Sequence, residues 1–225
     1  MCGRYALATP TDTLAAHFAA APPAAFQARY NIAPTQPVLA LISGDQGNEF
    51  THFRWGLIPS WAKDPSIGAR MINARAETAA EKPAFRTALR RRRCLLPASG
   101  YFEWVADGRA RQPHFIVRTD PGCLALAGIW ETWERDGNLL QTCAILTCAA
   151  NPDVENVHAR MPVCIASDDY QQWLSDLTVH EVVAMLQPAP AGSLRSYPVS
   201  RRVNSPRNDD PDCIEPQPTA AAALF

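Results

Sequence analysis

A run of short apolar segments between residues 94 and 148 constrains the fold of this chain more than any other feature. Gly, Asp and Pro residues separate the segments, and this punctuation is typical of turns between β-strands. We therefore expect successive strands over residues 94–96, 101–105, 113–118, 123–133 and 141–148. Closely linked short strands favour a sheet that curves on itself.

Elements on either side of this run complete an α+β pattern. Strands are expected at residues 38–42, 49–55 and 195–199, and helices at residues 11–20, 77–92 (broken near Pro83), 168–174 and 179–186. The pattern predicts one α+β domain, residues 1–207, with a curved, barrel-like antiparallel sheet flanked by helices. Residues 208–225 are acidic, Pro-rich and then Ala-rich, and we expect them to form a loose tail.

The formal net charge of -1 conceals two unlike halves. Residues 1–118 hold 15 Lys and Arg against 8 Asp and Glu, whereas residues 119–225 hold 6 against 14. Such asymmetry, together with many arginines, indicates a surface for nucleic acid or phosphate. For the four arginines at residues 90–93 taken alone, a solvated helix face is the favoured interpretation.

The cysteines and the N-terminal residues indicate a reducing compartment. Polar residues between Thr9 and His17 interrupt any secretory leader, so we expect a cytoplasmic protein, associated with the nucleoid if the source is bacterial. No apolar run approaches the ~20 residues of a membrane span, so no membrane partner is expected. The seven cysteines show no zinc-ligand spacing, so neither metal nor cofactor is predicted. Five sit in apolar surroundings and are expected in the core: Cys94, Cys123, Cys143, Cys148 and Cys164.

Cys2 offers chemistry that no internal cysteine can perform. If Met1 is removed, residue 2 carries both an α-amine, with a pKa near 8, and a thiol. Such a 1,2-aminothiol can attack an aldehyde first through nitrogen, giving an imine, and then through sulfur, giving a five-membered thiazolidine. The alternative is that a cysteine follows the start codon by accident.

Other polar residues each allow a functional and an ordinary interpretation. His158 is either a proton shuttle or a surface histidine. Glu103 stands between aromatic residues, and strand alternation leaves open whether it is an outward charge or a desolvated acid. Asn73 and Arg75 point to the same side of a strand and could hold a phosphate or sugar oxygen. Trp61 could stack on a base or serve the core.

Taken together, seven ordered motifs between residues 2 and 207 resemble the SRAP family of abasic-site processing proteins. The motifs are Met1-Cys2-Gly3-Arg4-Tyr5, Tyr30-Asn31-Ile32-Ala33-Pro34, Trp55-Gly56-Leu57-Ile58-Pro59 with Trp61, Asn73-Ala74-Arg75-Ala76-Glu77-Thr78, Gly100 to Trp104, His158-Ala159-Arg160-Met161-Pro162, and Ser200 with Val203-Asn204.

The resemblance implies a single domain with a basic groove for single-stranded DNA that contains abasic sites. It implies a covalent thiazolidine link between Cys2 and the abasic aldehyde, which protects the lesion during the DNA damage (SOS) response. Peptidase character through removal of Met1, and lyase character through the imine, are implied as well. We expect the protein to act as a monomer.

The resemblance also assigns roles by position. Cys2 is the nucleophile, Asn73 orients the sugar, Glu103 exchanges protons with the amine and imine, and His158 assists opening of the sugar ring. The expected DNA-binding residues are Arg4, Arg75, Trp61, Trp104 and Arg160.

Two other functions remain open on the residues alone. Cys2 could be the N-terminal nucleophile of a peptidase or amidase, with its amine as base and Asn73 as an oxyanion donor. The arginine-rich half and the tryptophans could equally form a non-catalytic site for single-stranded nucleic acid.

Overall fold

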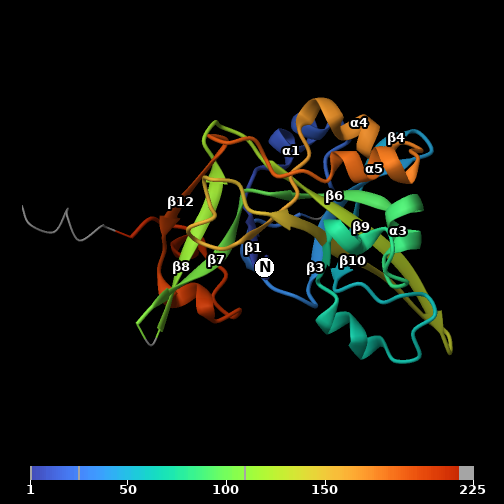
Figure 1. The fold of residues 1–225 in the computed structure, drawn as a ribbon, viewed down its shortest axis with the longest axis horizontal. Helices are drawn as coiled ribbons and strands as arrows, with labels where there is room; N and C mark the ends of the chain where they lie inside the picture. The colour runs from blue at the N-terminus through green and yellow to red at the C-terminus, as the bar shows by residue number, and fades with distance from the viewer. Residues whose placement is uncertain (1, 25, 109, 218–225) are drawn as a thin grey trace, which may run out of the picture.

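In the part of the chain that the computed structural model describes, residues 2–24, 26–108 and 110–217, five strands close into a barrel (Figure 1). They are β3 (Pro37–Gly44), β4 (Gly47–Trp55), β6 (Arg93–Ala98), β9 (Leu124–Arg135) and β10 (Asn138–Ala149). β10 closes the ring because it pairs with both β9 and β4. The predicted barrel-like sheet is confirmed, although β10 runs parallel to β4 rather than antiparallel.

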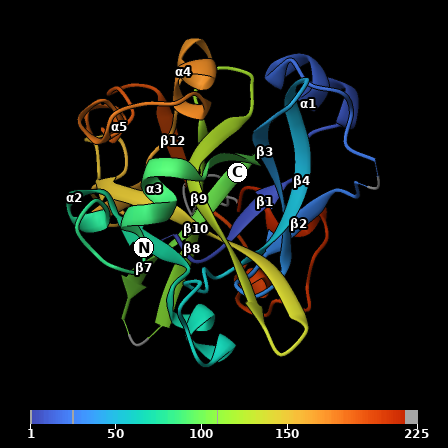
Figure 2. The ribbon, with the colours of Figure 1, turned by 90° about the vertical axis from the view of Figure 1, so that its right-hand side faces the viewer.

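Two further short strands extend β10 beyond the barrel. β5 (Asn73–Arg75) pairs with it in parallel, and β11 (Arg160–Pro162) pairs with it in antiparallel register. A second, five-stranded sheet lies beside the barrel and has the order β12 (Leu194–Pro198), β8 (Ala110–Arg118), β7 (Gly100–Asp107), β1 (Tyr5–Leu7) and β2 (Arg29–Ile32). Figure 2 shows the long β9 and β10 crossing the molecule diagonally.

Short helices cover the sheets. The α-helices are α1 (Thr11–Phe18), α2 (Ala76–Ala79), α3 (Arg86–Arg91), α4 (Tyr170–Leu174) and α5 (Val179–Met185), and the 3₁₀ helices are η1 (Pro65–Arg70), η2 (Ser167–Asp169), η3 (Arg201–Asn204) and η4 (Pro211–Cys213). The predicted helix at residues 77–92 is interrupted around Pro83, as expected, and becomes α2 and α3. Among the described residues, no helix is both long and apolar enough to cross a membrane.

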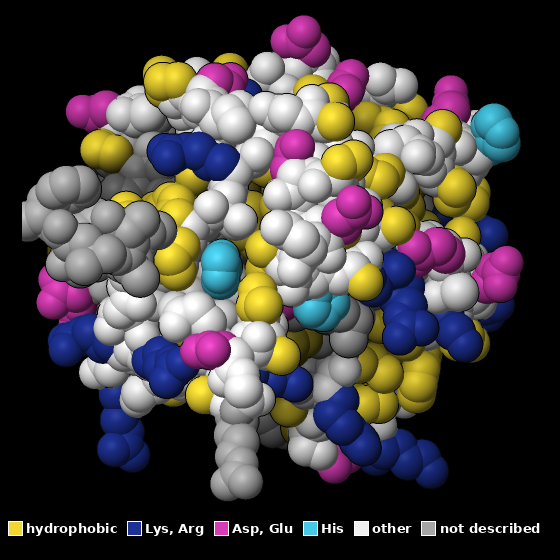
Figure 3. Space-filling view, turned by 60° about the vertical axis from the view of Figure 1, so that its left-hand side comes forward, with side chains coloured by type: hydrophobic (Ala, Val, Ile, Leu, Met, Phe, Trp, Pro, Cys, Tyr) yellow, Lys and Arg dark blue, Asp and Glu magenta, His cyan; other side chains and the backbone are white. Residues whose placement is uncertain are grey.

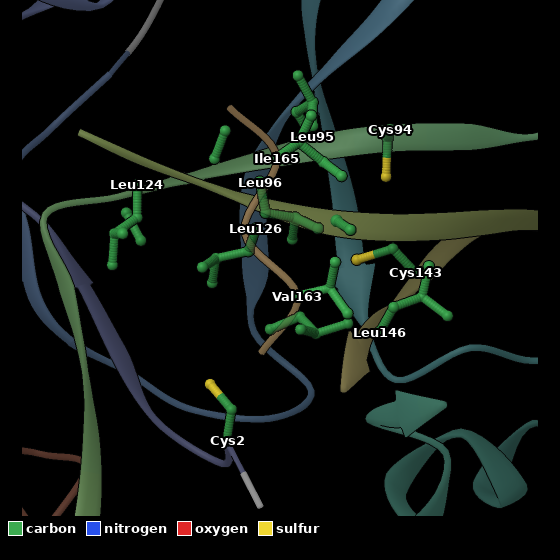
Figure 4. Close-up of a cluster of buried hydrophobic side chains, with 14 of the residues drawn as sticks. Cys2, Cys94, Leu95, Leu96, Leu124, Leu126, Cys143, Leu146, Val163 and Ile165 are labelled. Carbon is green, nitrogen blue, oxygen red and sulfur yellow. The ribbon is translucent and has the colours of Figure 1, made fainter. Parts of the chain in front are cut away.

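The barrel interior is filled by aliphatic, aromatic and thiol side chains. Cys94, Cys123, Cys143 and Cys148 are buried free thiols, as predicted, whereas Cys164 is only half-buried. Figure 4 shows Cys94 and Cys143 among the leucine side chains of this interior, with Cys2 at the margin of the cluster. The N-terminal segment therefore enters the domain instead of lying on its surface.

A close backbone approach brings the chain from β4 to the start of β5. Gly56 has φ 130°, and a Cβ there would lie 2.6 Å from the carbonyl oxygen of Gly68 in η1. Only glycine meets both conditions without strain. The indole of Trp55 donates to the carbonyl of Ile72 at 2.8 Å. These contacts fix the segment that leads directly into Asn73.

The arginines at residues 90–93 divide into two pairs. Arg90 and Arg91 are exposed, but Arg92 donates to Glu131 at 2.6 Å. Arg93 is buried, and its guanidinium donates to the carbonyl oxygens of Trp173, Leu89, Arg90 and Ser175. The solvated-face interpretation is therefore wrong for Arg92 and Arg93. Arg93 ties α3 to the end of α4, which no property of the isolated run could reveal.

The prediction of a loose tail is wrong for residues 209–217. Asp209 accepts hydrogen bonds from the Arg29 side chain and from the backbone of Tyr30 and Asn31. Cys213 is buried, and Pro216 forms a β-bridge with Val199 after β12. An acidic segment is ordered here because its carboxylate finds donors on β2. Residues 218–225, the rest of the predicted tail, lie outside the described residues.

Asn31 on β2 is the polar residue that holds this C-terminal segment in place. Its fully buried amide nitrogen donates to the carbonyls of Val203, Ser205 and Asn208 at 3.1, 3.0 and 2.6 Å. Its amide oxygen accepts from Arg4 at 2.7 Å.

Replacing this amide should destabilise the domain. Asn31→Ala removes the amide donor from the carbonyls of Ser205 and Asn208 and one of the two hydrogen-bond acceptors of the Arg4 guanidinium. We expect a loss of about 3 kcal/mol in the free energy of unfolding. Urea unfolding measures the change. The exposed Asn138→Ala serves as control and should stay within about 0.5 kcal/mol of the parent. Equal stability of both variants would contradict this role for Asn31.

Candidate active site

Four residues from four different strands or strand ends meet between the two sheets. Cys2 precedes β1 and Glu103 lies on β7, and these strands are neighbours in the second sheet. Asn73 begins β5 and His158 precedes β11, and both of these strands pair with β10. The structure thus brings together the four residues that the sequence singled out.

Cys2 is completely buried at this junction. Its thiol points to the carbonyl of Arg4, with 4.0 Å between sulfur and oxygen. Burial raises the pKa of the thiol well above its usual value, and the charge of Glu103 raises it further. Cys2 is therefore a neutral thiol at pH 7, and it must lose its proton during a reaction.

Asn73 fixes the position of Cys2. Its amide nitrogen donates to the carbonyl oxygen of Cys2 at 2.7 Å. Its amide oxygen is enclosed by protein and has no hydrogen-bond partner among the described residues. Because β5 is held in register by Ile145 of β10, this amide is presented from a rigid strand. The unused oxygen can accept a hydrogen bond from a group that enters the site.

Glu103 is a desolvated acid and not an outward-facing charge, the two possibilities that strand alternation left open. The residue is only 4% exposed. Burial raises the pKa of its carboxyl above the usual value, while the nearby His158 acts in the opposite direction. A carboxyl with a raised pKa accepts and returns a proton more readily than an exposed carboxylate does.

His158 is held in a defined orientation by the strand that follows it. The backbone N–H of Arg160 donates to its Nδ1 at 3.0 Å. The same Nδ1 lies 3.1 Å from the carbonyl oxygen of Arg160, so the backbone of this residue holds the ring whether Nδ1 accepts or donates. The half-buried ring can act as an acid when it is protonated.

Arg4 and Trp104 form one assembly beside these four residues. The Arg4 guanidinium donates to Asn31 and to the carbonyl of Val203, and lies 6.0 Å from the ring centre of Trp104. The Trp104 indole donates to Asn204 at 2.7 Å. An open depression of about 330 Å³ is lined by Trp104, Arg111 and Asn204. Sequence reasoning missed Arg111 and gave Asn204 no role.

The remaining expected DNA-binding residues differ in accessibility. Trp61 is 61% exposed and Arg75 is exposed on β5. Arg160 instead forms a two-pronged ion pair with Glu77, at 2.9 Å for each contact, and also donates to Thr147. Arg160 is therefore committed to binding β10 and α2 within the protein.

Charge is unevenly distributed over the face that Figure 3 presents, with the β7 and β8 side turned toward the reader. Lys and Arg side chains gather mainly in its lower half, around an apolar patch and a hollow, while most Asp and Glu side chains lie in the upper half. Within the described ranges, no group of three or more His, Cys, Asp or Glu side chains is arranged to hold a metal ion.

The chain belongs to the SRAP family, described as SOS response associated peptidase, whose model matches residues 1–206. It is 39% identical to the abasic site processing protein YoqW of Bacillus subtilis (strain 168), over 96% of this chain and 99% of that protein. It is 31% identical to the abasic site processing protein YedK of Escherichia coli (strain K12), over 84% of each chain.

The fold is also shared with a crystallised protein from Bacteroides thetaiotaomicron. The TM-score is 0.87 at 26% identity, and the match covers 96% of this chain and 100% of the other.

The buried Cys2 thiol should alkylate slowly at neutral pH. Because only the thiolate reacts and its pKa is raised, the rate with iodoacetamide should climb about tenfold per pH unit through pH 9. Glu103→Gln removes a nearby negative charge and should speed the reaction about threefold at each pH. Peptide-resolved mass spectrometry measures both rates. Alkylation of Cys2 at pH 7 as fast as that of free cysteine would contradict the assignment.

Proposed function

We propose that this chain is an abasic site processing protein. It binds single-stranded DNA and captures the aldehyde of an opened abasic sugar as a thiazolidine on Cys2, after Met1 has been removed. The observation that carries the proposal is the placement of Cys2, which Asn73 holds by its carbonyl beside the buried Glu103. Relatives at 31–39% identity that are named abasic site processing proteins support it.

The first step joins the amine to the sugar. The Cys2 nitrogen attacks the aldehyde carbon, and Glu103 accepts the proton that nitrogen releases. Glu103 passes that proton to the aldehyde oxygen, which completes the carbinolamine. The hydroxyl then leaves as water with a proton from protonated His158, and the nitrogen gives up its remaining proton to leave an imine. Protonated His158 is also suited to protonate the ring oxygen when the closed sugar opens.

The second step closes the ring. The Cys2 sulfur attacks the imine carbon, and the thiol proton passes through Glu103 to the nitrogen. One aldehyde and one aminothiol thus give one thiazolidine and one water. Because the thiol stays protonated until this point, it does not compete with the amine for the aldehyde.

Asn73 has two tasks in this scheme. Its nitrogen keeps the Cys2 carbonyl fixed, which directs the α-amine and the thiol into the same space. Its enclosed oxygen accepts a hydrogen bond from a sugar hydroxyl or from the forming ring. This arrangement favours sugar binding over an oxyanion hole, because the unpartnered buried atom of Asn73 is an acceptor whereas an oxyanion hole needs donors.

The DNA strand is proposed to pass between exposed cations and aromatic rings. Arg75 is suited to contact phosphate, and Trp61 and Trp104 to stack on the bases that flank the lesion. The Arg4 guanidinium lies against the ring of Trp104. Arg160, through its hydrogen bond to Thr147, holds β11 against β10 and so orients His158. Because no base occupies the lesion itself, binding depends on salt more than on sequence.

The same site is proposed to remove Met1 and to possess lyase character through the imine. The family description as a peptidase supports the first part. In the sequence, Met1 precedes Cys2, so the amine becomes available only after that bond is cleaved.

The test is crosslinking to a single-stranded oligonucleotide that carries one abasic site. Protein whose mass confirms loss of Met1 should give a band that survives denaturation, at most one DNA per protein. Cys2→Ala should abolish the band, because an imine alone reverses. Cys164→Ser, at a half-buried cysteine, is the matched control and should crosslink like the parent.

Three outcomes would contradict the proposal. An undiminished band with Cys2→Ala would place the crosslink elsewhere. Equal, salt-sensitive retention of intact and abasic strands, with no covalent product, would instead favour a non-catalytic binder of nucleic acid. Repeated turnover of amide substrates without crosslinking would favour an N-terminal nucleophile hydrolase.

A further inference from the structure

A second histidine stands directly opposite Glu103 in the sheet. β7 and β8 are antiparallel, and their register pairs Glu103 with His114. Residues opposite each other in an antiparallel pair point to the same face, with Cβ atoms about 4.5–5.5 Å apart. His114 is therefore the cross-strand neighbour of the proposed proton acceptor. No motif marks His114 in the sequence, because the register of two strands is not visible from either strand alone.

The environment of the imidazole is unusual. Nδ1 of His114 is enclosed by protein and has no hydrogen-bond partner among the described residues, although the residue as a whole is half-buried. The exposed part of His114 therefore lies away from Nδ1. A buried ring nitrogen without a partner is unfavourable, and it requires an explanation at the level of function or of a bound group.

The other residues on this face leave His114 with few possible proton partners. On β7 its neighbours at the facing positions are Glu103 and Tyr101. On its own strand they are Gln112 and Ile116, neither of which titrates. On β12 the facing positions hold Pro198 and Ser196, which carry no charge. Glu103 is thus the one carboxylic acid at the positions of β7, β8 and β12 that face the imidazole.

We propose that His114 is a positioning residue that shares a proton with Glu103 and so keeps the carboxyl in its proton-accepting form at neutral pH. With one proton on Nε2, Nδ1 offers a lone pair toward the interior. The Glu103 carboxylic acid gives its proton to Nδ1, which leaves a carboxylate and an imidazolium, and the imidazolium returns a proton to solvent. The inference rests on the function proposed above, since it deepens the role of Glu103.

The direction of the effect follows from the charges. Burial raises the pKa of Glu103 and lowers the pKa of His114, so each group alone favours its neutral form. A shared proton offsets part of both penalties, because the ionised pair attract each other. Removing the imidazole should therefore leave Glu103 protonated up to a higher pH.

The experiment compares the pH dependence of single-turnover crosslinking in the parent, His114→Gln and His114→Phe. Gln fills the site and hydrogen-bonds but does not titrate. We expect the rising part of the pH–rate curve to lie about half a pH unit higher in both variants, so that they react about threefold more slowly than the parent there and equally fast on the plateau. The exposed His180→Gln is the control and should follow the parent curve.

A second readout does not depend on the reaction. Carbon-13 NMR of the Glu103 carboxyl, assigned with Glu103→Gln, should show its titration midpoint move to higher pH in His114→Gln. Unchanged midpoints and superimposable pH curves would overturn the inference while the crosslinking function stands. If the parent forms no crosslink, the proposed function fails, and the NMR titration still decides whether the two residues share a proton.

Discussion

A single hydrogen bond between the two sheets underlies the rest of the site. Asn73 stands on a strand attached to β10 of the barrel, and Cys2 belongs to the segment that begins the second sheet. The 2.7 Å contact from the Asn73 amide to the Cys2 carbonyl joins them. Residues near a chain terminus ordinarily fray, and this contact instead holds Cys2 in a fixed position. The other residues of the candidate site are therefore described by their positions relative to Cys2.

Burial gives the surrounding groups their chemical character. Exclusion from water raises the pKa of the Cys2 thiol and of the Glu103 carboxyl, so both can hold a proton until the reaction requires its transfer. Two histidines lie near Glu103: His158 is oriented by the backbone of Arg160, and His114 stands opposite Glu103 in the register of β7 and β8. The site therefore contains few ionisable groups, each with a defined neighbour, in surroundings from which water is largely excluded.

The sequence predicted the strands of the barrel because short apolar runs carry that information. Its resemblance to the SRAP family, and no single residue pattern, pointed to the four residues that the structure brings together. The sequence could not predict what depends on contacts distant along the chain. Arg93 appeared to be one of four surface arginines, yet it binds carbonyls of α4. Asp209 appeared to belong to a loose tail, yet β2 supplies its donors. The burial of Glu103 could not be predicted, because strand alternation shows which residues share a face of the sheet but not which face is buried. Only the packing of the two sheets shows that the Glu103 side chain is buried.

The charge of -1 for the whole chain is compatible with a DNA substrate because the two signs lie on different parts of the surface (Figure 3). The central claim is that the amine and thiol of one residue close on one aldehyde. Intact mass spectrometry of the crosslinked product, prepared without any reductant, tests it most directly. The account predicts the mass of the protein lacking Met1 plus the DNA less one water, with the modification on Cys2. A product that persists only after borohydride reduction, or that retains Met1, would contradict it.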